Sequence, residues 1–446
     1  SHAEMEKSIR DGYQIMMNRA EYPGGGVGDI KYVCYPSIPS CSEGTGYAML
    51  AAAIMVDKPT FDGLWLWAHD NAMNLVKRYD NGEETSPGYL YSRLPGWQNA
   101  AGGNSAADGD FDIALALLIA YKQWGEFMGV NDSEGNPVSY KKGLIEILKG
   151  MTDTIPFASS NGKDLLSGDI GLDGYFKGGD TWTELTGWAS ENLPFNKPPN
   201  FEGPSTQHID YTCPAYFREF ADFLEDEDPD TYAWNIYQFR RAEASSDWLM
   251  GKLLEQDVRN IPVAGWVSLS KNNEATFTSF SDGEDFRLAW RTILNYVWHG
   301  NPDFSWDPDK HQIIKGKSNS HERDIGQRFA KFLWDTRQSP WNNPGIAGTT
   351  GDYWGPHVLF YYYTPQGEPM SVFNLNWLHG TGAPSAIASQ DFNLMAEMYR
   401  HADIEWDISE PGDGYLTSVP HYFHGIFKIL GMTILTGNHQ APSKIK

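Results

Sequence analysis

Three stretches of the chain bring a carboxylate and a glycine to the expected start of a helix. The first is CSEGTGYAML at residues 41–50, where Ser42 can cap the helix and Glu43 enters its first turn. The helix dipole favours a negative charge there, which would be a purely structural reason for the glutamate. Gly44 and Gly46 weaken a helix and are tolerated chiefly where something approaches the backbone closely. The glycines therefore favour a ligand site around Glu43.

The second stretch, NSAADGDFDIALALLIAYKQWG at residues 104–125, continues as an apolar helical stripe after its acidic start. Asp108 and Asp110 fall in the first turn, at the opposite end from the expected core contacts. Capping explains Asp110 as well as a functional role does. Asp108, which precedes Gly109, is the better candidate for a site.

The third stretch is SFSDGEDFRLAWRTILNYVWHG at residues 279–300, and its expected helix carries Arg287 and Arg291. Three acidic residues precede that helix: Asp282, Glu284 and Asp285. One interpretation is a surface ion-pair network. The alternative is a catalytic carboxylate that a neighbouring guanidinium keeps ionised.

A ring of helices that opens on one face would bring these three helix starts together. Glycoside hydrolysis needs such a set, because one protonated carboxyl group gives a proton to the leaving oxygen and one carboxylate activates water or attacks. Aromatic residues make up 14% of the chain, and aromatic rings stack on sugars. Burial explains most tryptophans more simply. Trp97, in the loop that leads to Asp108, is the predicted sugar platform.

Helical periodicity recurs from end to end and alternating strand patterns are scarce. The sequence predicts helices at about 4–20, 43–57, 60–78, 108–127, 138–152, 213–226, 230–256, 285–300, 320–336, 388–402 and 419–436. The connection at about 158–210 is unusually long and rich in aromatic residues, which favours an ordered, ligand-facing excursion. The best strand candidate is GDYWGPHVLFYYYTP, within residues 338–386. No linker divides the chain, so we expect a single all-α domain over residues 1–446.

Composition excludes several classes of partner. The 34 basic and 58 acidic residues give a net charge of −24, which argues against binding to nucleic acid or anionic membranes. No apolar run approaches the ~20 residues of a membrane span, and no signal peptide is visible at the start. The 12 histidines show no paired-ligand spacing, so we expect no metal and no cofactor. We expect a monomer.

The three cysteines cannot form a disulfide framework or a thiolate zinc site. Cys34 and Cys41 are close enough in sequence to bridge a loop. Their spacing alone leaves open whether they do, because a disulfide also requires suitable geometry. At least one cysteine, Cys213 if that bridge forms, stays unpaired.

Several of these stretches resemble glycoside hydrolase family 8. SEGTGYAM resembles the family's Ser-Glu-Gly-x-Gly-Tyr-Gly-Met segment, and AADGDFDIALALLIAYKQWG resembles its Ala-Thr-Asp-Gly-Asp-x-Asp-Ile-Ala signature. Further similarities lie at residues 210–221, 286–300 and 422–438. The resemblance implies an (α/α)6 barrel and inverting hydrolysis of β-1,4-linked polysaccharides. We expect the barrel to have long irregular loops and a small β-hairpin or sheet at the cleft side.

Carried onto this chain, the resemblance implies that Glu43 is the general acid. It also implies that Asp108 holds the sugar in the central subsite. Tyr211 matches a tyrosine near the catalytic water, and Arg287 matches the arginine three residues after the family's general base. Together with Arg287 and Tyr211, the remaining candidates for substrate binding are Trp97 and Asp110.

The base itself departs from the family's pattern. The family has an aspartate three residues before the arginine, whereas this chain has Glu284 there. An ungapped register makes Glu284 the base, and a small bulge in SDGED would give the role to Asp285 or Asp282.

The predicted function is a secreted or periplasmic endo-β-1,4-glucanase that acts on cellulose or mixed-linkage glucan. The alternatives on the same scaffold are a β-1,4-xylanase and then a chitosanase, whose cationic substrate the net charge would attract. A different class is a non-catalytic glycan-binding protein. Such a protein should lack one of the paired carboxylates, and this chain retains candidates for both.

Overall fold

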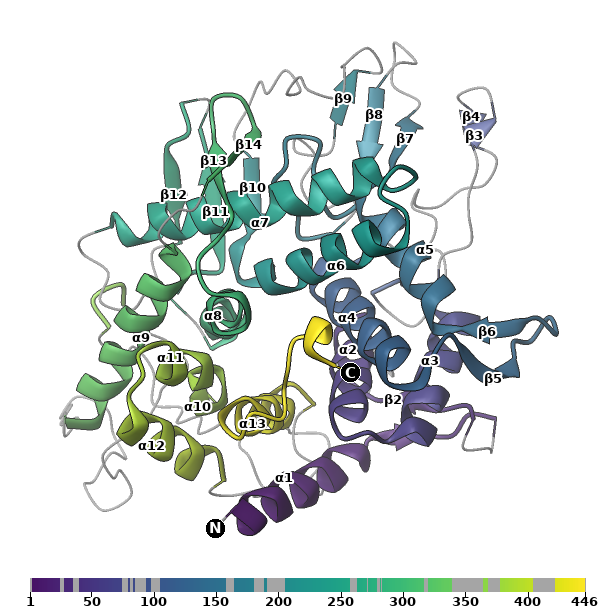
Figure 1. Cartoon of the computed structure of the whole chain (residues 1–446), viewed down its shortest axis with the longest axis horizontal. Helices are drawn as coiled ribbons and strands as arrows, with labels where there is room; N and C mark the ends of the chain where they lie inside the picture. The colour runs from purple at the N-terminus through teal and green to yellow at the C-terminus, as the bar shows by residue number, and fades with distance from the viewer. Residues whose placement is uncertain are drawn as a thin grey trace, which may run out of the picture.

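The computed structural model describes most of the chain. The described residues are 2–24, 28–34, 40–73, 79–80, 83–84, 94–97, 105–157, 164–179, 188–190, 205–256, 263–270, 272–278, 281, 283–316, 320–338, 364–367, 378–403 and 422–445. Figure 1 shows that the helices in this part of the chain form a ring around one axis.

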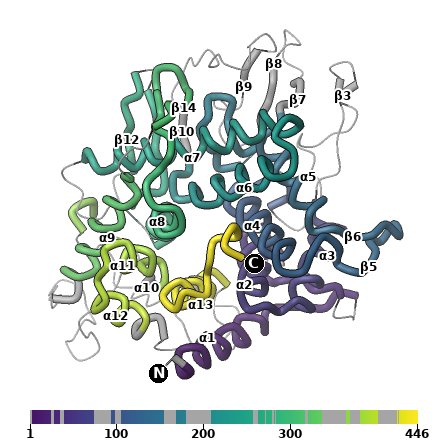
Figure 2. Tube along the Cα trace, in the orientation of Figure 1, coloured from purple at the N-terminus to yellow at the C-terminus, as the bar shows by residue number. Residues whose placement is uncertain are grey.

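The inner helices of the ring contact one another in chain order. They are α2 (Ser42–Ile54), α4 (Ala107–Trp124), α6 (Pro214–Glu227), α8 (Arg287–His299), the short pair α10 (Leu378–Thr381) and α11 (Ala383–Ala388), and α13 (Tyr422–Leu435). The last of them, α13, packs against α2 and so closes the ring. Figure 2 accordingly shows the yellow C-terminal helix beside the purple N-terminal ones.

The remaining helices lie outside this ring. They are α1 (His2–Met17), α3 (Lys58–Asn71), α5 (Tyr140–Thr152), α7 (Ala233–Leu254), α9 (His321–Gln338) and α12 (Phe392–Asp403). Each packs against at least one inner helix, such as α3 on α2 and α7 on α6. The predicted all-α fold and its (α/α)6 architecture are confirmed.

Residue type explains which helices are inner. Every residue of α4 from Ala107 to Ala120 is buried, and α2 is buried almost throughout, since both are rich in alanine and other small or apolar residues. A helix that is apolar on all sides is stable only inside a protein. The outer helix α5 instead buries one stripe with helical spacing, formed by Leu144, Ile147, Leu148 and Met151.

Glycines allow α2 and α4 to cross at close range. A Cβ atom on Gly109 would lie 2.6 Å from the backbone nitrogen of Glu43, and one on Gly46 would lie 2.8 Å from Cβ of Asp112. The space beside Gly44 is filled by a disulfide sulfur. The predicted close approach to the backbone at these glycines is therefore made by protein atoms, and the ligand site around Glu43 stays a prediction.

The strands are short and antiparallel. They are β1 (Ala20–Glu21), β2 (Lys31–Tyr32), β3 (Tyr79–Asp80), β4 (Glu83–Glu84), β5 (Phe127–Asn131), β6 (Pro137–Ser139), β7 (Thr154–Phe157), β8 (Asp164–Ser167), β9 (Trp188–Ser190), β10 (Ser205–His208), β11 (Trp266–Leu269), β12 (Ala275–Phe277), β13 (Phe304–Asp307) and β14 (Gln312–Lys315). The sheet β10–β11–β12 leads directly into the 3-10 helix η1 (Ile209–Tyr211), which borders the site described below.

Parts of the long excursion are ordered. Strands β8, β9 and β10 belong to it, and residues 168–179 form a buried loop. Most of the predicted strand candidate, residues 351–363, lies outside the described residues. Cys34 and Cys41 form a disulfide, with Cα atoms 6.1 Å apart, and Cys213 is a buried free thiol. None of the helices in the described part of the chain is both long and apolar enough to cross a membrane.

Candidate active site

The N-terminal ends of the inner helices meet at one end of the ring. Their polar residues include Glu43 and Asp108 in the first turns of α2 and α4, Arg287 and Tyr422 as the first residues of α8 and α13, and Asp210 and Tyr211 in η1 just before α6. The expectation that separate helix starts would share one face is confirmed by the contacts between these side chains.

Arg287 joins three carboxylates. Its Nη1 donates to Oε1 of Glu43 at 2.6 Å and to Oδ2 of Asp108 at 3.2 Å, and its Nη2 donates to Oδ2 of Asp210 at 2.6 Å. Burial alone would lower the pKa of Arg287, but Asp210 and Glu43 raise that pKa well above its usual value. The guanidinium therefore stays charged and holds the three acids together.

One positive charge does not neutralise three carboxylates. Burial raises the pKa of Asp108 well above its usual value, and the neighbouring Glu43 raises it further, while Arg287 and Arg291 act in the opposite direction. Asp108 therefore binds its proton more tightly than an exposed carboxyl group does.

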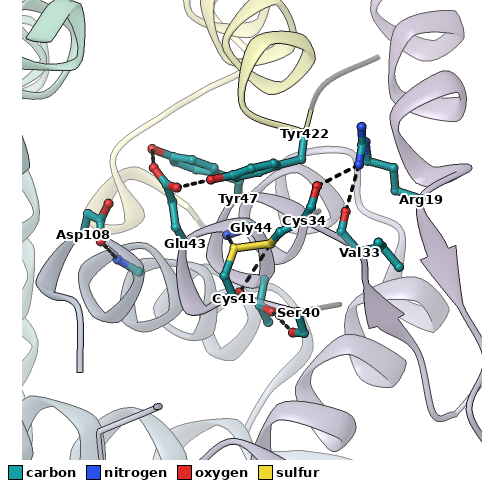
Figure 3. The surroundings of a disulfide bond; sticks show 12 residues. Arg19, Val33, Cys34, Ser40, Cys41, Glu43, Gly44, Tyr47, Asp108 and Tyr422 are labelled. Carbon is teal, nitrogen blue, oxygen red and sulfur yellow. Dashed lines mark hydrogen bonds between the residues drawn. A yellow bond between two sulfur atoms is a disulfide. The ribbon is translucent and has the colours of Figure 1, made fainter. Parts of the chain in front are cut away.

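Two tyrosine hydroxyls complete the surroundings of Glu43. Tyr47 donates to Oε1 at 3.2 Å, and Tyr422 donates to Oε2. Figure 3 shows the two hydroxyls on the two oxygens of the carboxyl group, with Asp108 beside it and the disulfide below. The Glu43 side chain keeps 15% of its surface exposed, so part of it remains open to a substrate.

A second buried arginine lies behind the first. Arg291 and Asp112 are fully buried, and Nη2 of Arg291 donates to Oδ2 of Asp112 at 2.7 Å and to the Tyr47 hydroxyl at 3.2 Å. Burial raises the pKa of Asp112 to about 6, although the contact with Arg291 lowers it. A hydrogen-bonded chain thus runs from Asp112 through Arg291 and Tyr47 to Glu43.

The sequence reasoning missed Asp112, Asp210 and Tyr422. Asp112 lies four residues after Asp108, so the two share one helix face, and this spacing could have revealed it. Asp210 directly precedes the predicted Tyr211. Nothing in the local sequence around Tyr422 indicates its partner.

The three candidates for the base differ in what the structure shows of them. Glu284, in the 3-10 helix η2 (Glu284–Phe286), has a side chain that is 57% exposed, and its Oε2 lies 3.6 Å from Nη2 of Arg287. Asp285 is only 6% exposed, and its own Oδ1 fills the space beside Gly265. Asp282 lies outside the described residues. Glu284 therefore combines solvent exposure with contact to the central arginine.

Aromatic side chains border the site on two sides. The guanidinium of Arg287 lies 4.8 Å from the ring centre of Tyr211, which stacks on His208 at 4.5 Å. Burial raises the pKa of Tyr211 well above its usual value. Trp97 is half-buried, and its carbonyl accepts a hydrogen bond from the Ser42 nitrogen at 3.1 Å, next to Glu43.

Asp110 does not sit at the surface as an ordinary capping charge would. It is fully buried within α4, and its N–H donates to the Ala106 carbonyl at 3.2 Å. Its contact with substrate stays a prediction. Within the described ranges, no three His, Cys, Asp or Glu side chains are grouped so that they could hold a metal ion.

Comparison with known proteins gives consistent matches. Residues 36–142 match the family model described as glycosyl hydrolases family 8. The chain is 22% identical to endoglucanase A of Acetivibrio thermocellus over 419 residues, which is 94% of this chain and 66% of that protein. It is 38% identical to a β-glucanase of Niallia circulans over 108 residues, 22% of this chain and 24% of the relative. The matches thus span less than two thirds of these relatives' length.

Solved structures resemble the whole chain. The apo structure of a β-1,3-1,4-glucanase from Paenibacillus sp. X4 has a TM-score of 0.65 at 16% identity, covering 99% of this chain and 94% of that one. A family 8 xylobiose complex from Teredinibacter turnerae has a TM-score of 0.63 at 15% identity, covering 100% and 97%. At such low identity the likeness establishes the fold alone.

Proposed function

Because the chain belongs to glycoside hydrolase family 8, we propose that it hydrolyses β-1,4-linked polysaccharides with inversion at the anomeric carbon. The observation that carries this proposal is the group of three carboxylates on Arg287: Asp108 and Asp210 are buried, Glu43 is partly exposed, and burial raises the pKa of Asp108 well above its usual value. Glycoside hydrolysis requires a carboxyl group that still has its proton when the substrate binds.

Glu43 is the general acid of the proposed mechanism. It is partly open to substrate, it shares Nη1 of Arg287 with Asp108, and three donors orient its carboxyl group. The proton moves from Glu43 to the glycosidic oxygen while the bond between that oxygen and the anomeric carbon breaks. A water molecule attacks the opposite face of the sugar and gives its proton to the base.

Glu284 is the proposed base, ahead of Asp285. Its exposure leaves room for a water molecule beside it, whereas Asp285 is packed against Gly265. Glu43 and Glu284 contact terminal nitrogens of the same guanidinium. Their separation is thus limited to the two contact distances plus the width of that group, which is compatible with the ~6.5–9.5 Å of an inverting pair.

The proposed contacts to the sugar come from the remaining candidates. Asp108 lies beside the acid and would hold the central sugar, and Tyr211 borders the arginine near the position of the attacking water. Trp97 is the proposed platform of a neighbouring subsite, since its backbone is bonded to the start of α2. Asp110 is the weakest of the four candidates because it is fully buried.

The proposed substrate is cellulose or mixed-linkage glucan, cleaved within the chain. Relatives described as endoglucanases and β-glucanases support this choice. A β-1,4-xylanase is the second candidate, supported by the structural likeness to a xylobiose complex and to a xylose complex from Paenibacillus barcinonensis. A chitosanase ranks third. The retained carboxylates argue against a protein that only binds glycans.

We also propose that the chain works as one monomeric catalytic domain, secreted or periplasmic. A single hydrophobic cluster includes residues of α1 and α13, which supports one domain. The disulfide between Cys34 and Cys41 supports an oxidising compartment, where such bonds form and persist.

A product profile tests the function. Wild-type protein and Glu43→Gln are incubated with carboxymethyl cellulose, barley glucan, xylan and chitosan. We expect the wild type to release oligosaccharides from the glucans and the variant to lose about 10²–10⁴-fold in kcat, because an amide cannot protonate the leaving oxygen. Proton magnetic resonance should show the α-anomer first. Near-normal turnover of the variant, or an initial β-anomer, would contradict the mechanism.

A further inference from the structure

The two oxygens of the Glu43 carboxyl group have different hydrogen-bond partners. Oε1 accepts from Nη1 of Arg287 at 2.6 Å and from the hydroxyl of Tyr47 at 3.2 Å. Oε2 is bonded to the hydroxyl of Tyr422. The difference matters because a protonated carboxyl group carries its hydrogen on only one oxygen.

One donor on Oε1, the guanidinium, cannot reverse its role. A guanidinium has only donors, so Arg287 can never accept a hydrogen bond from the carboxyl group. In the structure the Tyr47 oxygen accepts from Nη2 of Arg291, and its hydrogen is donated to Glu43. Arg291 is fixed in turn by two contacts to the buried Asp112, at 2.7 and 3.3 Å. A proton on Oε1 would therefore face two other hydrogens.

Tyr422 differs from the guanidinium. A hydroxyl can donate one hydrogen bond and accept two, so rotation about its C–O bond changes its role without moving the ring. The ring is 4% exposed and packs edge-on against Phe423, which holds the oxygen in place while the hydrogen turns. Oε2, unlike Oε1, is bonded to no guanidinium among the described contacts, and the hydroxyl on it can accept a hydrogen bond from the protonated carboxyl group.

We infer that the catalytic proton of Glu43 resides on Oε2 and that Tyr422 is a catalytic residue which accepts this proton's hydrogen bond before the reaction and donates to the same oxygen afterwards. The inference rests on the proposed function, in which Glu43 is the acid. Tyr47 and Arg291 are positioning residues, since they act by keeping the proton off Oε1.

The proposed step is balanced. The O–H bond at Oε2 breaks and an O–H bond forms on the glycosidic oxygen, whose bond to the anomeric carbon breaks. Oε2 gains the negative charge that the proton leaves behind. The Tyr422 hydroxyl then turns to donate to it, and this interaction is stronger in the transition state than in the ground state. Such interactions raise kcat without lowering KM.

Kinetics with Tyr422→Phe test this inference. On barley glucan or xylan we expect kcat to fall about 10–100-fold, as for loss of a hydrogen bond to a charged group, while KM changes little. On an aryl glycoside with a good leaving group, which needs no acid, kcat should be nearly unchanged. The basic limb of the pH profile should move to higher pH, because the ionised carboxyl group has lost a donor. The charged groups facing Glu43 in this argument are Arg287 and Arg291 on α8, Asp108 and Asp112 on α4, and Asp210 in η1.

The matched control is Tyr13→Phe. Tyr13 is buried and also donates to a carboxylate, that of Asp57 at 2.8 Å, on the outer side of the ring. Tyr13→Phe should lower the free energy of unfolding without changing the ratio of kcat on polysaccharide to kcat on the aryl glycoside, and without changing the pH profile. Equal losses on both substrates for Tyr422→Phe, or an unchanged kcat on polysaccharide, would overturn the inference.

Infrared difference spectra separate this inference from the proposed function. The carbonyl band of protonated Glu43 is the band that Glu43→Gln removes during acid titration. We expect Tyr422→Phe to shift this band, because its hydrogen-bond partner is gone, whether or not the protein degrades any polysaccharide offered. A band that Tyr422→Phe leaves in place and Tyr47→Phe moves would assign the proton to Oε1 and contradict us.

Discussion

Glu284 and Asp285 are neighbours in sequence but occupy different environments, and this difference can be tested. Glu284→Gln should lower kcat on polysaccharide about 10²–10⁴-fold with little change in stability, because the side chain is 57% exposed and its contact with Arg287 is at 3.6 Å. Asp285→Asn should affect the free energy of unfolding more than kcat, since this carboxylate is packed against Gly265. Measuring kcat and urea unfolding for both variants decides which of the two carboxylates acts as the base. The reverse pattern would make Asp285 the base.

At the residue scale, the sequence predicts which residues belong to the site better than it predicts the contacts between them. Glu43 and Asp108 could be singled out because each precedes a glycine at a helix start, and Arg287 because it follows three acidic residues and matches the family's arginine. Tyr422 could not, because its contact with Glu43 joins positions 379 residues apart and leaves no local pattern. The sequence narrows the proposed base to a short acidic stretch, and the structure separates Glu284 from Asp285 by exposure, by the contact with Arg287 and by the packing beside Gly265.

At the scale of elements, Gly109 decides how closely α2 and α4 approach. Alanine is the better helix former by about 1 kcal/mol, so propensity alone predicts that Gly109→Ala stabilises the protein. The added Cβ, however, would lie 2.6 Å from the backbone nitrogen of Glu43. We expect the clash to prevail, with a loss of about 1–3 kcal/mol in the free energy of unfolding and a displaced Glu43 that lowers kcat.

Gly28→Ala is the control for this substitution, because Gly28 has no atom within 4 Å of an added Cβ. Urea unfolding and activity of the two variants should therefore differ clearly. If Gly109→Ala were as stable and as active as Gly28→Ala, the close crossing of α2 and α4 would not be what positions the acid.

Helices and strands were not equally predictable. Each helix expected from periodicity is present, because an apolar stripe or an all-apolar run is a local property of the sequence. The helices α10 and α11 are too short to show such a period. The sheets depend on pairing between segments that are distant in the sequence, such as Ser205 opposite Leu269. A local sequence pattern does not indicate which distant segment a strand pairs with.

For the whole molecule, we expect the buried His439 near the end of α13 to make the free energy of unfolding fall in acid. His439 is 4% exposed between the rings of Trp290 and Trp298, and burial lowers its pKa to about 3. A histidine that is neutral when folded keeps its stabilising effect above its unfolded pKa of about 6.5 and loses it as the pH falls towards the folded value.

We therefore expect the wild type to lose stability relative to His439→Phe between about pH 6.5 and pH 3. At about pH 4.5 the difference should have changed by on the order of 2–3 kcal/mol from its value at neutral pH. Urea unfolding of both proteins at the two pH values measures it. Parallel pH curves for the two proteins would show that folding does not lower the pKa of His439.

The contact between Tyr422 and Glu43 also has a consequence for biosynthesis. Glu43 is synthesised 379 residues before Tyr422, which begins the inner helix α13. Synthesis at about 5–20 residues per second separates the two by tens of seconds. Throughout that interval α13 is missing from the ring and Glu43 lacks one of its partners. The contacts around Glu43 are therefore completed only when α13 has been made.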